Sequence, residues 1–236
     1  MKSKSNLTMV IDGSNLAYRA YFKFRNIQTT SYGHLGLVYG FIKILQSYLI
    51  RFKPTKLVVI FDTKESKRSN FRNTLLDGYK IQRSIKTNLD FDYKQFNKQL
   101  KSLRGILTSL GVSVIWDNKG LGHETDDYIA HIVTKGKKDK NLIISSDKDF
   151  YQLVTKKTKI FNPSQDKLIT LYNGEEVYGY TPKLHKEFLI LNGDASDSVP
   201  GYKGMGPVRC KAFFKQFGSI EGYLNSPDEY PCVTLS

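Results

Sequence analysis

The sequence predicts an α/β fold in which helices flank a mainly parallel central sheet. Short apolar runs rich in β-branched residues recur along the chain, as buried strands do. Segments with helical spacing of apolar residues separate these runs, and this alternation is typical of a parallel sheet. The chain has 236 residues and is 40% hydrophobic, which is enough for one sizeable core with a small appended subdomain.

In the N-terminal half, the apolar run LTMVID predicts a strand over Leu7–Asp12. Apolar residues at helical spacing predict a helix over Leu35–Phe52, which Pro54 ends. The run KLVVIFD then predicts a second buried strand, Lys56–Asp62. The stretch that follows is polar and weakly periodic, and we expect a mobile segment or loose helices there.

The C-terminal half continues the alternation. A helix is expected over Tyr93–Leu110, closed by Gly111, before a third strand with the sequence VSVIWD. The segment ETDDYIAHIV starts another helix with Thr125 as its N-cap, and NLIISSD predicts a fourth strand. The run KIFNPSQDKLITLYN is typical of a hairpin, and short helices broken by glycines are expected from about Pro182.

The net charge indicates a polyanionic partner. The chain has 36 Lys and Arg against 22 Asp and Glu, a formal charge of +14 and a pI near 9.6. Such a basic excess is most often found in proteins that bind nucleic acid. Residues Thr63 to Arg104 carry 11 Lys and Arg against 4 Asp and Glu, an excess of 7. Half of the net charge in so short a stretch favours a localised binding surface over a merely soluble basic one.

Membrane insertion and secretion are not expected. No run approaches the roughly 20 apolar residues of a membrane helix, and the apolar run after the basic N-terminus is too short for a secretory signal. The two cysteines, Cys210 and Cys232, lack metal-type spacing, so we expect free thiols in a reducing cytoplasm.

Nine acidic residues follow strands, begin a helix or share one loop, and the fold directs at least seven of them to one edge of the sheet. Converging carboxylates repel one another, and some would take up protons unless cations compensate. Mg²⁺ and Mn²⁺ prefer oxygen ligands, and two such ions about 4 Å apart activate a water and stabilise the leaving oxygen of a phosphodiester. The nine residues are Asp12, Asp62, Glu124, Asp126, Asp127, Asp147, Asp149, Asp194 and Asp197.

Each acidic group alone has a simpler interpretation. An Asp after a strand is often a helix N-cap or a turn residue. The acids of ETDD suit the positive end of a helix, and DKD by itself fits a surface turn. The nine together are harder to explain in this way, so we favour a metal site.

The segment Val199–Ser219 has the pattern G-x-x-G-x-G followed by Pro207 and helical spacing. Glycines let backbone N–H groups approach phosphates closely at a helix N-terminus. A dinucleotide-binding loop is rejected, because it would follow an early strand. A helix–turn–helix element that grips a duplex backbone fits better, and a purely structural helical hairpin is the remaining alternative. Basic side chains near enough to add charge are Lys203, Arg209, Lys211 and Lys215.

Six segments, VIDGSNLAYRA, VVIFD, GYKIQR, HETDDYIA, ISSDKDFYQLV and LNGDASDSVPGYKGMGP, occur in this order over about residues 7–220. In them the chain resembles the 5′-nuclease or flap endonuclease superfamily, especially bacteriophage and bacterial 5′–3′ exonucleases and the 5′-nuclease domain of bacterial DNA polymerase I. The resemblance implies a PIN-like catalytic core over residues 1–181. It also implies a helical arch or clamp at about residues 63–100, through which a free 5′ end passes. Residues 182–236 would form a helix–three-turn–helix DNA-binding region, shorter than is usual for the family.

The resemblance also implies roles for individual residues. One of two divalent ions, Mg²⁺ or Mn²⁺, would be held mainly by Asp12, Asp62, Glu124 and Asp126. The site would be completed, partly through water, by Asp127, Asp147, Asp149, Asp194 and Asp197. Lys80 and Arg83 would contact the scissile phosphate, and Tyr79 would stack on a base or serve in packing. Duplex phosphates, often with a K⁺ ion, would meet Gly201, Lys203, Gly204, Gly206, Arg209 and Lys211.

The function that the resemblance implies is that of a metal-dependent, structure-specific 5′-nuclease. It would be a monomer in the cytoplasm, or in the host cytoplasm for a phage protein, and would act on duplex DNA beside a 5′ end or flap. Hydrolysis would leave a 5′-phosphate and a 3′-hydroxyl, and RNA-primer removal in replication or repair is one use. One alternative is a PIN-type ribonuclease, although PIN domains are usually shorter and lack the glycine-rich element. The other is a truncated, non-catalytic DNA-binding module.

Overall fold

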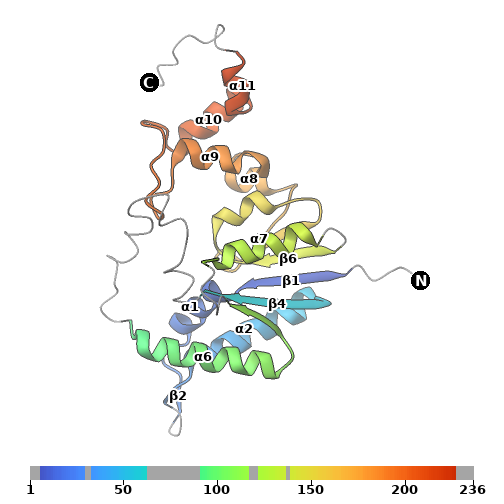
Figure 1. The fold of residues 1–236 in the computed structure, drawn as a ribbon, viewed down its shortest axis with the longest axis vertical. Coiled ribbons are helices and arrows are strands. Elements are labelled where there is room, and N and C mark those ends of the chain that lie inside the picture. Colours follow the sequence, from blue (N-terminus) through green and yellow to red (C-terminus); the bar gives the residue numbers. More distant parts are fainter. Residues whose placement is uncertain (1–5, 30–32, 63–90, 117–121, 137–138, 227–236) are drawn as a thin grey trace, which may run out of the picture.

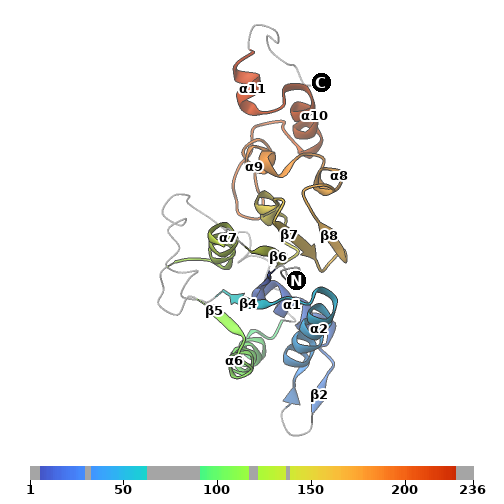
Figure 2. The same cartoon turned by 90° about the vertical axis from the view of Figure 1, so that its right-hand side faces the viewer.

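A six-stranded sheet forms the centre of the molecule. The structure is a computed structural model that describes residues 6–29, 33–62, 91–116, 122–136 and 139–226. The strands, in their order across the sheet, are β5 (Ser113–Trp116), β4 (Lys56–Phe61), β1 (Leu7–Asp12), β6 (Lys140–Ile144), β7 (Thr158–Asn162) and β8 (Lys167–Ile169). All neighbours pair in parallel except β8, which returns antiparallel to β7 (Figure 2). The predicted mainly parallel sheet and the hairpin at its edge are confirmed.

Helices cover both faces of this sheet. On one face lie α1 (Gly13–Lys23), α2 (Gly36–Phe52) and α6 (Tyr93–Ser109), and on the other lies α7 (Thr125–Lys135) (Figures 1 and 2). Side chains alternate between the two faces of a strand. In β1, Met9 and Ile11 therefore join the apolar cluster under α1 and α2, while Val10 joins the cluster under α7.

The second cluster continues beyond the sheet into the C-terminal helices. These elements are the 3₁₀ helices η1 (Lys148–Leu153) and η2 (Pro182–Leu184) and the helices α8 (Gly174–Tyr178), α9 (His185–Asn192), α10 (Pro207–Phe217) and α11 (Ile220–Leu224). Tyr180, Phe188, Cys210 and Phe214 share one buried cluster with Val10 of the central strand. The helices above the sheet in Figure 1 thus rest on the same apolar core as α7.

Several boundaries differ from the sequence-based expectation. Glu124, not Thr125, is the N-cap of α7, because its backbone is extended while Thr125 is already helical. The fourth strand ends at Ile144, so Asp147 caps η1 instead of ending β6. The short helices after Pro182 are confirmed, whereas α1, α8 and the small hairpin β2 (Gln28–Thr29) with β3 (Gly33–His34) were not anticipated.

The expected arch lies largely outside the described residues, which omit positions 63–90. The last part of that range, from Tyr93 onward, is the start of α6, where Phe96 and Gln99 are buried against the core. This part therefore packs against the core, and the extent of the arch stays a prediction. Cys210 is a buried free thiol, while Cys232 lies outside the described residues. In the described ranges, no helix is both long and apolar enough to cross a membrane.

Gly13 provides a test of how closely α1 approaches β4. A Cβ atom at Gly13 would lie 2.7 Å from the Ile60 carbonyl oxygen and 2.6 Å from the Phe61 ring. We expect Gly13→Ala to destabilise the fold by about 1–3 kcal/mol, because this overlap forces the helix outward. Gly105→Ala is the control: it lies within α6 with nothing within 4 Å of its added Cβ. It should stabilise the fold by about 0.5–1 kcal/mol. Urea unfolding measures both, and equal effects would contradict the close approach.

Candidate metal centre and nucleic-acid interface

The candidate site lies where the order of the strands reverses. The chain leaves β1 towards β4 on one side and later crosses to β6 on the other, and ligands of open α/β sheets bind at such a switch point. Asp12 ends β1 and caps α1, accepting a hydrogen bond from the Asn15 backbone N–H at 2.9 Å. Its second oxygen accepts from the Ser145 hydroxyl, 2.9 Å away and just beyond β6. Asp12 therefore ties together the two strands that flank the switch point.

Asp62 makes the corresponding connection on the side of β4. Its backbone N–H donates to the Ser14 hydroxyl of α1, and its Oδ1 accepts from the Thr125 N–H at the start of α7, both at 2.9 Å. Asp62 is thus fixed between helices on opposite faces of the sheet, by its backbone N–H on one side and its carboxylate on the other. This contact also brings the start of α7 against the end of β4.

The start of α7 carries three of the predicted acids. Glu124 and Asp127 form a capping box, in which Asp127 Oδ2 accepts from the Glu124 N–H at 3.0 Å. Asp126 lies between them and is electrostatically coupled to Asp12, Asp62, Asp147 and Glu124. The structure therefore brings together acids from four separate parts of the sequence.

Asp147 and Asp149 complete this edge from η1. Asp147 Oδ1 caps the 3₁₀ helix by accepting from the Asp149 N–H at 2.9 Å. The Ser145 hydroxyl that donates to Asp12 also accepts from the Asp147 N–H at 3.1 Å. Capping, the simpler interpretation of these acids, is correct for Asp12, Asp127 and Asp147. A capping contact uses one carboxylate oxygen, and a carboxylate offers about four acceptor positions.

Burial and mutual repulsion raise two pKa values in this group. Burial, with smaller contributions from Asp62 and Asp147, raises the pKa of Asp12 to about 7 despite its hydrogen bonds. Burial followed by repulsion from Asp12 raises the pKa of Asp126 to about 8. Within the described residues, no three Asp, Glu, His or Cys side chains form a ready-made metal cluster. Hydrogen bonds to the protein hold the carboxylates of Asp12, Asp62, Asp127 and Asp147.

Asp194 and Asp197 lie in the loop between α9 and α10. Burial alone would raise the pKa of Asp194, but hydrogen bonds from the Ser196 side chain and backbone and the Lys148 charge lower it. Lys148 Nζ lies 3.8 Å from Asp194 Oδ2 and joins this loop to η1. The Asp197 N–H donates to the Asp194 carbonyl. The loop therefore lies next to the carboxylate edge of the sheet, on the side where β1 enters α1 in Figure 1.

The glycine-rich segment forms an exposed loop that leads into α10. Gly206 is the N-cap of α10 and Pro207 occupies its first turn, as predicted. Gly204 has a φ of +86°, and its carbonyl accepts from Arg209 Nη1 at 3.0 Å. A Cβ at Gly201 would collide with the Asn192 backbone, so the loop crosses the end of α9 closely. Lys203, Lys211 and Lys215 are exposed.

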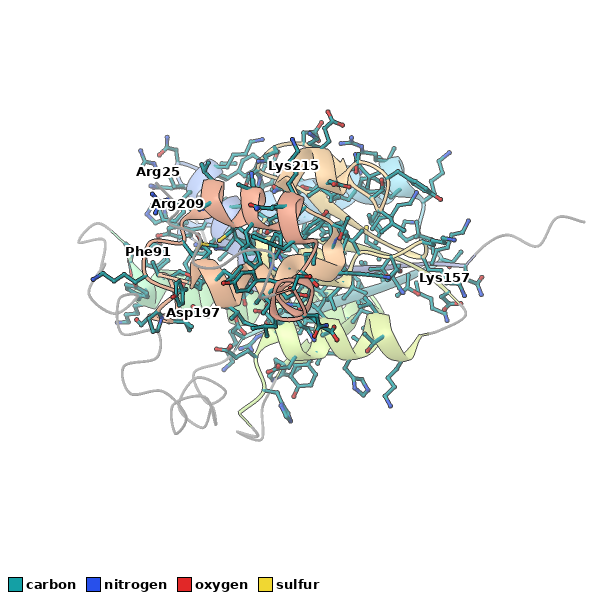
Figure 3. The ribbon with its side chains drawn as sticks, turned by 90° about the horizontal axis from the view of Figure 1, so that it is seen from above. Arg25, Phe91, Lys157, Asp197, Arg209 and Lys215 are labelled. Carbon is teal, nitrogen blue, oxygen red and sulfur yellow. The ribbon has the colours of Figure 1, made fainter. Side chains whose placement is uncertain are left out.

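Figure 3 places Arg209 and Asp197 on one side of the molecule, with Lys157 on the other. Three predicted residues, Tyr79, Lys80 and Arg83, lie outside the described residues. Residues that sequence reasoning missed are Asn15, Ser145 and His185. Ser145 lies within the segment ISSDKDFYQLV that carries the resemblance, so its position was a usable signal. For His185 no local signal was available.

Three comparisons with known proteins identify the family and the fold. The model of the family described as 5′-3′ exonuclease, N-terminal resolvase-like domain, matches residues 7–180. A 5′-3′ exonuclease of Buchnera aphidicola subsp. Schizaphis graminum is 33% identical over 227 residues, which are 95% of this chain and 75% of that protein. The thermostable DNA polymerase I of Thermus thermophilus is 31% identical over 93% of this chain, but over only 25% of the polymerase. Among solved structures, a bacteriophage T5 D15 flap endonuclease in complex with DNA and metal ions has a TM-score of 0.73 and 21% identity. The match covers 94% of this chain and 79% of that chain.

The raised pKa of Asp126 predicts how stability depends on pH. Ionising this carboxyl in the folded chain is unfavourable, so its contribution to stability is present below about pH 4 and is lost as the pH rises towards 8. In EDTA, we expect Asp126→Asn to raise the melting temperature by several degrees at pH 8, with less effect at pH 5. Thermal unfolding followed by circular dichroism measures this.

The control for this prediction is Asp139→Asn. A hydrogen bond from Lys56 lowers the pKa of Asp139, so Asp139 stays ionised between pH 5 and 8. The control variant should keep the pH dependence of the unmodified chain. If Asp126→Asn showed the same pH dependence as the unmodified chain, the pKa of the Asp126 carboxyl would not be raised.

Proposed function

The chain belongs to the 5′–3′ exonuclease family, and we propose that it uses two divalent cations to cleave DNA beside 5′ ends or flaps. It is a nuclease of the structure-specific 5′ type. The observation that carries this proposal is the convergence of carboxylates at the switch point. Burial and mutual repulsion raise the pKa values of Asp12 and Asp126 there. Cations would offset this repulsion.

The donor set fits Mg²⁺ or Mn²⁺, because it consists of carboxylate oxygens on rigid elements, and hydrogen bonds hold those of Asp12, Asp62 and Asp147. When bound, two such ions would activate a water and stabilise the leaving oxygen of a phosphodiester. We assign one ion mainly to Asp12, Asp62, Glu124 and Asp126. We assign the rest of the site to Asp127, Asp147, Asp149, Asp194 and Asp197, partly through water.

The hydrogen-bond network sets the positions of these ligands before substrate arrives. Ser145 and the Asn15 N–H fix Asp12, while the Thr125 N–H fixes Asp62. Asn15 Oδ1 in turn accepts from the Ser146 hydroxyl at 2.9 Å and links α1 to the chain after β6. Preorganised ligands lower the reorganisation that binding and reaction require.

Basic groups would hold the nucleic acid around this acidic centre. We propose that Lys80 and Arg83 neutralise charge on the scissile phosphate, that Tyr79 stacks on a base, and that the segment after Asp62 forms the arch. The loop Gly201–Gly206 and α10 would bind duplex phosphates through backbone N–H groups, Arg209 and lysines, with K⁺ at the loop. In this division, residues 1–181 form the catalytic core and residues 182–236 the duplex-binding region.

We further propose that the chain acts as a monomer and that its substrates include RNA-primed 5′ ends formed during replication or repair. The polyanion would approach because of the net charge of +14. Family membership argues against the non-catalytic module. A preference for RNA flaps over DNA flaps would instead favour the PIN-type ribonuclease.

Asp147→Asn tests the metal-site assignment. We expect this variant to lose cleavage of a labelled 5′-flap DNA in Mg²⁺, because the neutral amide cannot offset cation charge. DNA affinity, measured by fluorescence anisotropy in Ca²⁺, should remain close to that of the unmodified chain. Asp166→Asn is the control, since Asp166 is exposed in an ion pair with Arg51 and should leave cleavage unchanged. Near-normal cleavage by Asp147→Asn would refute the assignment, and EDTA should stop the unmodified enzyme.

Removing charge from α10 tests the duplex-binding surface. Lys211 and Lys215 are exposed one turn apart on α10. If both contact phosphates, Lys211→Ala/Lys215→Ala should lower the slope of log affinity against log salt by about 2. Lys157→Ala is the control and should leave the slope unchanged, because Lys157 lies well apart from Lys215 in Figure 3. Anisotropy titrations at several KCl concentrations measure the slopes, and equal slopes for both variants would exclude α10 from the interface.

A further inference from the structure

His185 is a fully buried polar side chain that the proposed chemistry does not use. It is the first residue of α9, and its side chain has no exposed surface. The ring stacks on Tyr180 at 6.0 Å and on Phe188 at 6.4 Å, and meets Tyr151 edge-on at 5.8 Å. These aromatic contacts fix the plane of the imidazole ring.

The two ring nitrogens face different groups. Nδ1 lies 3.1 Å from the Tyr180 hydroxyl, and Nε2 lies 3.6 Å from Asp149 Oδ1. Burial raises the pKa of Tyr180, so its hydroxyl keeps the proton and can donate it to Nδ1. A neutral imidazole has one donor and one acceptor. With Nδ1 as the acceptor, Nε2 carries the hydrogen and directs it at the carboxylate.

Asp149 presents a matching acceptor. Its Oδ1 is buried and, like His185 Nε2, has no hydrogen-bond partner in the described part of the chain. The separation of 3.6 Å is longer than a hydrogen bond, so the contact is electrostatic at this distance. Leaving a buried donor and a buried acceptor without partners costs free energy for each of them. A hydrogen bond between His185 and Asp149 would satisfy both groups.

The Asp149 carboxylate has two different sides. Its side chain is 33% exposed although Oδ1 is buried, so the accessible part lies away from His185. Tyr178, whose pKa is raised by burial, Asp147 and Asp149, places Asp149 in the same electrostatic environment as Asp147. Asp149 follows Asp147 by two residues on η1, and the exposed part of its carboxylate is the part left free to bind a cation.

We propose that His185 is a positioning residue: its Nε2–H holds Oδ1 of Asp149, so that the carboxylate offers its other oxygen to a divalent cation at the acidic edge. This rests on the proposed function, in which Asp149 is a metal ligand. Groups that hold a metal ligand from behind commonly change metal affinity by about 10- to 100-fold when they are removed.

The position of His185 adds a second consequence. It lies on the first helix of the proposed duplex-binding region, while Asp149 lies on η1 of the core. Lys148 and Asp194 bridge the same two regions. Through the His185–Asp149 contact, the orientation of a proposed metal ligand thus depends on the position of α9 against the core.

Mn²⁺ binding to the full chain without DNA, measured by the electron paramagnetic resonance of free Mn²⁺, tests this proposal. His185→Phe keeps a planar ring but removes the donor, and we expect it to weaken binding of one Mn²⁺ by about 10-fold. His185→Gln places an amide donor near the position of Nε2 and should restore most of this affinity. The Mg²⁺ concentration for half-maximal flap cleavage should rise in His185→Phe and return most of the way in His185→Gln. DNA affinity in Ca²⁺ should stay constant in both variants.

Equal weakening by His185→Phe and His185→Gln, or unchanged Mn²⁺ binding by His185→Phe, would overturn the proposal. If His185→Phe does not fold, nitrogen NMR of the unmodified chain decides: a proton on Nδ1 instead of Nε2 overturns it, and the reverse supports it. Asp149→Asn tests the metal-ligand role of Asp149 separately from the proposed function of the chain. Unchanged Mn²⁺ binding by this variant would remove Asp149 from the metal site and the inference with it. Metal-independent cleavage by the unmodified chain would refute the proposed function itself.

Discussion

Repulsion between carboxylates at one end of the sheet is the constraint on which the rest of the structure depends. Asp12, Asp62, Asp126 and Asp147 come from separate segments and share one partly buried space. Such a cluster persists only if its surroundings hold the carboxylates in place. Ser145, the Asn15 N–H and the Thr125 N–H do so, and each also ties one secondary-structure element to another.

The same carboxylates therefore serve in folding and in the proposed chemistry. Asp12 and Asp147 begin the helices that follow β1 and β6, and Asp127 closes the capping box of α7. Helix starts at the carboxyl ends of strands thus bring several acids together without any long loop. Exposed basic residues lie on α10 and the glycine loop, where phosphates rather than metal ions are the expected ligands.

The sheet, α2, α6 and the helix after Pro207 were predictable because their signals are local: β-branched runs, helical spacing and a proline at a first turn. The shared location of the acids followed from the rule that parallel strands end at one edge. The His185–Asp149 contact was not predictable, because it joins residues 36 positions apart through packing that no local pattern encodes. Thr125 was assigned as the cap because Thr is a favoured cap residue, but the backbone turns one residue earlier, at Glu124.

The buried cluster that runs from Val10 through Phe150 and Tyr180 to Phe214 has a mechanical consequence. Because tightly packed interiors transmit displacement with little compression, α10 has a fixed distance from the end of β1. A duplex seated on α10 would then meet the acidic edge at a set number of nucleotides from its junction. Side-chain packing in this cluster, rather than base recognition, would measure out where the strand is cut.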